Sequence, residues 1–312
     1  MGADLGQLRS RSQNYALLAQ IVASGFDEAL LPILRFSPRY GPVLQGLSVS
    51  DLAQRHQRIF GFDISPVAGA FLDPKGRVGG PLSDQLTENL IAIGAKPDAG
   101  DFEPEALAEQ LALLSRLVGG EVEGWENERP EEWQGFQLAQ GLVLHQHLMP
   151  WLPPLVVALS MQSERAYQVL GEEIWSCSHG HLADLDPRCD GYQTSQPAGR
   201  DGGGLLSAPE TGLAQIAAFL VRPLDSGWYL SRSDLAAVAA EAGASLAPGS
   251  RQQMMEDLLY AVELESLVQT LAGKVDAWSA AYAALAAPNL IRPWGQRLHE
   301  TRQMIAGLGA AT

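Results

Sequence analysis

The chain of 312 residues lacks the features that mark most secreted and membrane proteins. Its only two cysteines, Cys177 and Cys189, cannot provide the disulfide framework of a small secreted domain. No run of about 20 consecutive apolar residues occurs, so no membrane-spanning helix is predicted. Residues 1–15 are mostly polar and lack the apolar segment of a signal peptide, which leads us to expect a cytoplasmic protein.

Basic residues are also scarce in this sequence. Lysine and arginine together number 21 against 36 aspartates and glutamates, which gives a net charge of −15. This balance opposes binding to a phosphate backbone, so we expect no nucleic-acid partner. An acidic chain attracts basic ligands over long distances, for example a peptide with paired arginines. The same charge can equally serve only to keep the protein soluble.

The alternation of polar and apolar residues that is typical of a half-buried strand is missing as well. Nearly every ordered stretch instead repeats its apolar residues at helical spacing, and 46% of all residues are hydrophobic. We therefore predict an all-α globular protein. The predicted helices cover residues 15–25, 50–60, 83–94, 104–118, 133–149, 153–175, 212–221, 233–242, 251–271, 275–285 and the segment after Pro293.

A change in composition after residue 175 predicts the domain organisation. Residues 176–207 are rich in glycine, aspartate, serine and proline and show little periodicity. Such a composition is typical of a linker or a long loop. We predict an N-terminal helical domain over residues 1–176, a flexible linker or loop over 177–206, and a C-terminal helical unit over 207–312.

No catalytic motif is found in the sequence. There is no Gly-x-Ser-x-Gly and no His-Glu-x-x-His, and the glycines of residues 71–80 lack the spacing of a nucleotide-binding loop. We therefore predict no catalytic residues and no cofactor. His145 and His147 lie two residues apart on a predicted helix, point in different directions, and are poorly placed to ligate one metal.

One alternative function is a metal-binding enzyme. Two thiolates and two imidazoles would complete a tetrahedral zinc site. The candidate ligands are Cys177, His179, His181 and Cys189. Their spacing is not a standard zinc-ligand spacing, so unpaired cysteines and linker histidines are the competing interpretation, and our main prediction contains no metal site.

Three segments together resemble the TorD/DmsD/NarJ family of chaperones for molybdenum-containing redox enzymes. Residues 145–153 place His147 and Trp151 four positions apart at a corner between two predicted helices. Residues 103–111 match four positions of that family's Glu-Pro-Asp-His-Leu-x-x-Glu-Leu segment, and residues 219–235 are similar to longer members. The resemblance implies a TorD-like helical bundle with an additional C-terminal helical unit.

The function implied by this resemblance is that of a cytoplasmic assembly chaperone, not an enzyme. It would bind the signal peptide or the apo form of a molybdenum-cofactor redox enzyme before cofactor insertion and export. The partner would be a molybdopterin oxidoreductase subunit or its twin-arginine signal peptide. Members of this family can exchange helices between subunits, and residues 176–207 are long enough to allow such a homodimer.

The resemblance also suggests a client-binding surface. An apolar groove would take the hydrophobic part of the peptide, and acidic residues would meet its arginines. The residues assigned to this surface are Phe71, Asp73, Glu103, Glu105, Glu109 and Trp151. Structural interpretations stay open, since residues 71–80 can form a glycine-containing turn and acidic residues favour a helix N-terminus. A helical interaction scaffold unrelated to redox enzymes is the third alternative.

Overall fold

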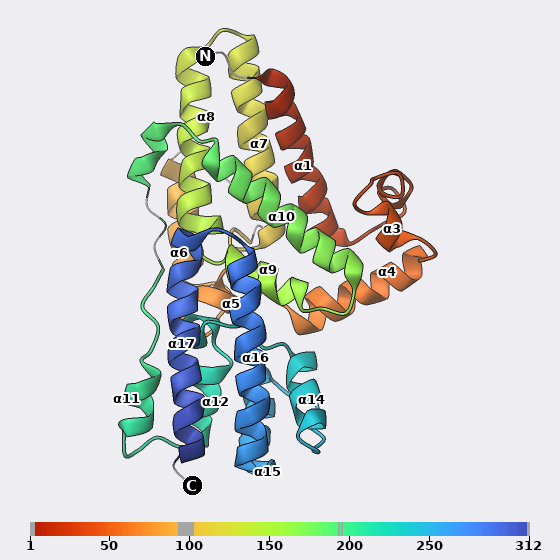
Figure 1. The fold of residues 1–312 in the computed structure, drawn as a ribbon. Coiled ribbons are helices and arrows are strands. Elements are labelled where there is room, and N and C mark those ends of the chain that lie inside the picture. The colour runs from red at the N-terminus through yellow and green to blue at the C-terminus, as the bar shows by residue number, and fades with distance from the viewer. Residues whose placement is uncertain (1–3, 93–102, 193, 195, 311–312) are drawn as a thin grey trace.

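The computed structural model describes residues 4–92, 103–192, 194 and 196–310 (Figure 1). Within these ranges the protein is all-α, as the periodicity predicts, and no strand is present. An isolated antiparallel bridge joins Val67 to Ala106 and ties together two segments that are far apart in the sequence. The TorD-like arrangement of the helices stays a prediction.

The first half of the chain forms ten α-helices and two π-helical segments within the described ranges. Helices α1, α7 and α8 run side by side, and α10 crosses them (Figure 1). The elements are α1 (Leu5–Ser24), α2 (Leu31–Leu34), α3 (Gly41–Leu44), α4 (Val49–His56), η1 (Gln57–Asp63), α5 (Gly69–Leu72), α6 (Pro81–Ala92), α7 (Leu107–Glu126), α8 (Pro130–Leu142), η2 (Val143–Leu148), α9 (Leu152–Ser160) and α10 (Arg165–Ala183).

The second half is built around a long helical hairpin. Helices α16 and α17 pack against each other, and α11 lies along α17 (Figure 1). The elements are a 3-10 turn η3 (Pro187–Gly191), α11 (Gly202–Ser207), α12 (Leu213–Leu220), α13 (Pro223–Ser226), α14 (Arg232–Glu241), α15 (Arg251–Ala261), α16 (Leu264–Ala284) and α17 (Pro288–Ala310).

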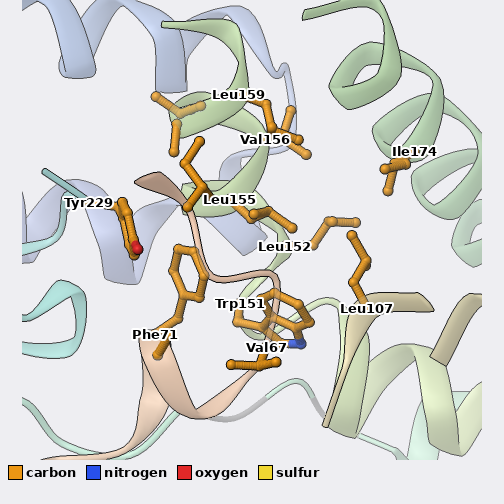
Figure 2. Packing of buried hydrophobic residues seen from close by; sticks show 14 of the residues in the cluster. Val67, Phe71, Leu107, Trp151, Leu152, Leu155, Val156, Leu159, Ile174 and Tyr229 are labelled. Carbon is orange, nitrogen blue, oxygen red and sulfur yellow. The ribbon is translucent and has the colours of Figure 1, made fainter. Parts of the chain in front are cut away.

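One continuous cluster of buried side chains, from Tyr15 to Ile305, joins both halves. At its centre the ring of Phe71 stacks on that of Tyr229 with centroids 4.9 Å apart, and Trp151 lies against the other side (Figure 2). The Tyr229 hydroxyl also donates to the carbonyl of Asp63. The predicted units 1–176 and 207–312 therefore share a core.

The linker predicted to start at residue 177 begins with helical residues. Helix α10 continues to Ala183, because Ser178 and His181 are buried on its inner face and hold this turn against the bundle. Cys189 is also buried, with an exposed fraction of 1%. The predicted helix over 153–175 is interrupted between α9 and α10, where the Gln168 side chain donates to the carbonyl of Gln162.

Glycine pairs mark the end of a helix less reliably than the sequence suggests. The helix predicted to end before Gly119 continues through Gly120 to Glu126. A Cβ atom at Gly120 would lie 2.5 Å from the ring of Phe136, and one at Gly124 would lie 2.9 Å from the backbone nitrogen of Trp133. These glycines therefore let α8 approach α7 closely instead of ending it.

Other helix boundaries are confirmed or moved by the structure. Ser231 caps α14, and the carboxylate of Asp234 accepts from the Ser231 amide, which confirms the predicted capping box. Ser48, not Ser50, caps α4 in the same way. The predicted break between helices 251–271 and 275–285 is wrong, since the chain breaks instead at Val262, which is extended. The predicted end of the helix at residues 93–94 lies outside the described residues.

Candidate functional site

The two aromatic residues assigned to the client-binding surface lie in the core. Phe71 and Trp151 are each 0% exposed, and their rings contact each other with centroids 5.4 Å apart. Tyr229 from the second half of the chain covers Phe71. Neither aromatic side chain is available to a peptide in this fold, so the proposed apolar groove is not formed by them.

Two of the assigned carboxylates hold a loop in place. Asp73 accepts from the backbone amides of Lys75 and Arg77, at 2.7 and 3.1 Å, and forms an ion pair with the Arg77 side chain at 3.2 Å. Burial alone would raise the pKa of Asp73, but the bonds from Arg77 and Lys75 outweigh it and lower this pKa. The buried Glu105 accepts from the amides of Gly69 and Gly79. Both carboxylates therefore have a structural role.

Glu103 and Glu109, the other two residues assigned to the client-binding surface, do not form a site with Asp73 and Glu105. Glu103 is exposed just before the Val67–Ala106 bridge, and Glu109 lies half-buried in the first turn of α7. The six residues thus separate into a pair of core aromatics, two loop-fixing carboxylates and two acidic residues near a helix start. Some members of this set lie near one another, but the three groups do not form a continuous surface.

The four candidate metal ligands face different neighbours. His181 contacts Tyr15, whereas His179 stacks on Trp175 with ring centroids 5.2 Å apart. Burial raises the pKa of the Cys177 thiol to about 11, which keeps it protonated. Among the described residues no group of three or more histidine, cysteine, aspartate or glutamate side chains could hold a metal ion. Cys177, His179, His181 and Cys189 are therefore not gathered into a zinc site in the described part of the chain.

His147 has a structural role, as its place at a helix end suggests. Its ring is buried, and its Nε2 atom lies 3.1 Å from the amide nitrogen of Asn89. Burial lowers the pKa of His147 to about 4, so the imidazole is neutral near pH 7.

A cavity of about 520 Å³ lies between α1, α7, α8 and α10 and forms a candidate site. Its size falls within the range of small-ligand sites. Polar and aromatic side chains from all four helices meet there, and of these residues the sequence singled out only His181, as a candidate metal ligand. The lining residues are Asp4, Gln7, Leu8, Arg11, Glu121, Trp125, Trp133, Gln137, Gln140, His181, Asp184, Leu185 and Asp186.

A pair of stacked tryptophans forms one wall of this cavity. The rings of Trp125 and Trp133 are 4.1 Å apart between centroids and inclined by only 14°. They come from the end of α7 and the start of α8, and the missing side chain of Gly124 allows the backbone of Trp133 to approach. The Nε1 atom of Trp125 is buried and has no hydrogen-bond acceptor among the described residues.

A chain of hydrogen bonds leads through the cavity wall to Glu121. The Tyr15 hydroxyl lies 3.0 Å from Nδ1 of His181, and Nε2 of His181 lies 2.9 Å from Oε1 of Gln140. The amide nitrogen of Gln140 donates to Glu121 at 2.9 Å, and that of Gln137 donates to its other oxygen at 2.7 Å. Since the Gln140 oxygen can only accept, Nε2 of His181 carries the proton and Nδ1 accepts from Tyr15.

Glu121 is the carboxylate of the cavity that lacks both a cation and a backbone donor among the described residues. It is 3% exposed, and no lysine, arginine or histidine nitrogen of the described chain lies within 4 Å of it. Arg11 pairs with Asp184, and Asp186 is bound by Arg188 at 2.8 Å. Asp4 accepts from the first amides of α1 as its N-cap.

His181 supplies no charge to balance Glu121. Burial, and to a lesser extent the nearby Arg11, lowers the pKa of His181 to about 3. The imidazole is therefore neutral at physiological pH. The cavity combines an aromatic wall, four carboxylates and a single guanidinium, and this composition favours a cationic ligand.

The sequence does contain one indication of this cavity, namely the spacing of two of its residues. Glu121 and Trp125 lie four residues apart, which places them on the same face of α7. The burial of that face depends on α1, α8 and α10, which no local pattern specifies. Because the helix was predicted to end before Gly119, the sequence pattern assigned no role to Glu121 and Trp125.

Comparisons of the chain with family models, with curated proteins and with solved structures found no match. In the described residues no single helix has the length and apolar composition to cross a membrane, and one pair bent by 62°, Pro130–Leu148 with Leu152–Ser160, meets those criteria jointly.

Proposed function

We propose that the protein is an assembly chaperone that binds a basic segment of a client protein and catalyses no reaction. The client we propose is a molybdenum-cofactor redox enzyme, bound through its twin-arginine signal peptide or in its apo form before cofactor insertion and export. The observation that carries the binding function is the cavity beside Glu121, where a buried carboxylate has no cation among the described residues. The resemblance of residues 103–111 and 145–153 to the TorD/DmsD/NarJ family supports the choice of client.

The charge of the whole molecule supports the same function. A net charge of −15 attracts a basic peptide before contact and raises the rate of encounter. Once the peptide is near, a desolvated carboxylate gives a charge-assisted hydrogen bond that is stronger than one at the surface. Long-range attraction and a local acceptor therefore act on the same kind of ligand.

The test is affinity capture of the tagged protein from its native host under anaerobic growth, with the bound proteins identified by mass spectrometry. We expect recovery of a molybdopterin oxidoreductase subunit. The variant Glu121→Gln should recover much less of it, whereas Glu123→Gln, an exposed residue on the same helix, should not change the yield. If the folded and abundant protein recovers no such subunit, the proposed client is wrong, and another recovered client would identify a different scaffold function.

A further inference from the structure

We infer that the cavity beside Glu121 is a site for the guanidinium group of an arginine side chain, with Glu121 as its counter-ion and the tryptophan pair as its stacking wall. The inference deepens the proposed function, on which it rests for the basic character of the client. It assigns the contact to residues outside the segments that resemble the chaperone family.

The first reason is the state of the Glu121 carboxylate. Burying a carboxylate away from water is unfavourable unless a partner offsets the loss of hydration. Two glutamine amides offset part of this cost, since each donates to one oxygen of Glu121. Each oxygen has a second lone pair, so a ligand with two N–H donors can bind in addition to the amides.

The second reason is the shape and chemistry of the wall. A guanidinium group is planar, weakly hydrated and stacks on aromatic faces, whereas an ammonium group is compact and strongly hydrated. Trp125 and Trp133 lie nearly parallel, at 14°, and line the same cavity as Glu121. The site therefore favours arginine over lysine.

The third reason is that the guanidinium groups in and beside the cavity are already paired with aspartates. Arg11 is bound to Asp184, and the neighbouring Arg188 is bound to Asp186 and donates to Gln137 at 3.3 Å. Neither guanidinium lies within ion-pair distance of Glu121. An incoming cation therefore does not have to displace an existing ion pair.

The fourth reason is that the carboxylate is held rigidly. Tyr15 orients His181, His181 orients Gln140, and Gln140 donates to Glu121 through the bonds described above. A fixed acceptor loses little conformational freedom when the ligand binds, which increases affinity. The indole N–H of Trp125, which has no acceptor in the described part of the chain, can donate to a carbonyl oxygen next to the arginine, and this favours a peptide over an isolated guanidinium ion.

Isothermal titration calorimetry of the full chain with N-acetyl-arginine-amide tests this inference. The comparison ligands are N-acetyl-lysine-amide and the neutral N-acetyl-citrulline-amide. We expect saturable binding of the arginine compound, at least tenfold weaker binding of the lysine compound and no measurable binding of citrulline. Glu121→Gln should weaken arginine binding by about 30-fold, as loss of a buried charged partner does elsewhere.

Matched variants keep the result interpretable. Glu123→Gln removes the same charge from an exposed position of α7 and should bind like the wild type. Trp133→Leu, which removes one ring of the wall without touching the carboxylate, should also weaken binding and serves if Glu121→Gln does not fold. The inference is overturned if the wild type shows no saturable binding, or if Glu121→Gln and Glu123→Gln bind equally well.

The two proposals can fail separately. Capture of a molybdopterin oxidoreductase subunit without binding of the arginine compound would overturn the guanidinium site and leave the chaperone function. Binding of the arginine compound without capture of such a subunit would leave the site and overturn the proposed client.

Discussion

Three histidines lie where burial favours the neutral imidazole. Burial lowers the pKa of His56, of His147 to about 4 and of His181 to about 3. His181 is the most consequential of them, because its ring joins the Tyr15 hydroxyl to Gln140 and thereby to the Glu121 carboxylate. Protonation of this ring would place a second donor against the Tyr15 oxygen and break the order of donors and acceptors in the chain.

The lowered pKa values of these histidines determine how the stability of the fold depends on pH. The unfolded chain binds protons to histidine below about pH 6.5 while buried His181 and His147 stay neutral, so the free energy of unfolding falls as the pH decreases. Each of the two contributes a loss of about 1 kcal/mol between pH 6.5 and 5.5. Urea denaturation at several pH values measures this slope.

The control for this prediction is His181→Gln, which should reduce the slope by the share of one histidine. The glutamine can keep a donor toward Gln140 and an acceptor toward Tyr15. An unchanged slope in the variant would mean that His181 does not resist protonation in the folded state.

At the residue scale the sequence identifies types of residue but not their burial. Glu121 is one of 36 acidic residues, and its amide partners Gln137 and Gln140 lie 16 and 19 positions away on another helix. Conversely, Phe71 and Trp151 were assigned to a client-binding surface that the family resemblance implies. Tyr229, more than 70 positions from either residue, covers Phe71 in the fold.

At the scale of elements, helical periodicity predicts the all-α fold and most helices, but several of their ends depend on packing. The pair Gly119-Gly120 predicts a helix end, because glycine has a low helix propensity. In the folded protein Gly120 and Gly124 face α8. A side chain at Gly120 would collide with Phe136, and one at Gly124 would collide with Trp133. The gain from close packing of α7 and α8 exceeds the loss of helix propensity.

Two alanine substitutions in α7 separate propensity from packing. Gly119→Ala should stabilise the protein by up to about 1 kcal/mol, since the new Cβ atom meets only the Ser12 hydroxyl at 3.6 Å. Gly124→Ala should destabilise it by about 1–3 kcal/mol, because the Cβ atom would lie 2.9 Å from the Trp133 backbone. Chemical denaturation of both variants measures the difference in sign.

The same pair also bears on the cavity. A shift of α8 that relieves the Gly124→Ala collision moves Trp133 relative to Trp125, so arginine binding should weaken in this variant and not in Gly119→Ala. Equal stability changes in the two variants would show that α8 does not press on α7 at this glycine.

At the scale of the whole molecule, the change in composition after residue 175 predicts two helical units, whereas the buried cluster extends through both. Polar bonds cross the same region: Ser65 donates its amide to the Tyr229 hydroxyl at 3.2 Å, and the Asp63 carboxylate accepts from Ser233. These contacts join segments more than 160 positions apart, which a periodicity analysis cannot detect. A shared core predicts that both halves unfold together.

Expression of residues 1–183 alone tests this prediction. Removing the second half takes Tyr229 away from Phe71 and the Trp294 indole, which donates to the Pro150 carbonyl, away from the α9 corner. Each newly exposed large apolar side chain costs about 1.5–3 kcal/mol, enough to remove most of the stability of a domain this size. We expect the fragment to show helical circular dichroism without a cooperative thermal transition, whereas the full chain melts in a single transition by calorimetry. A cooperative transition in the fragment would instead establish an independent N-terminal domain, and the contacts of Phe71 with Tyr229 would then be an interface between two domains and not their common core.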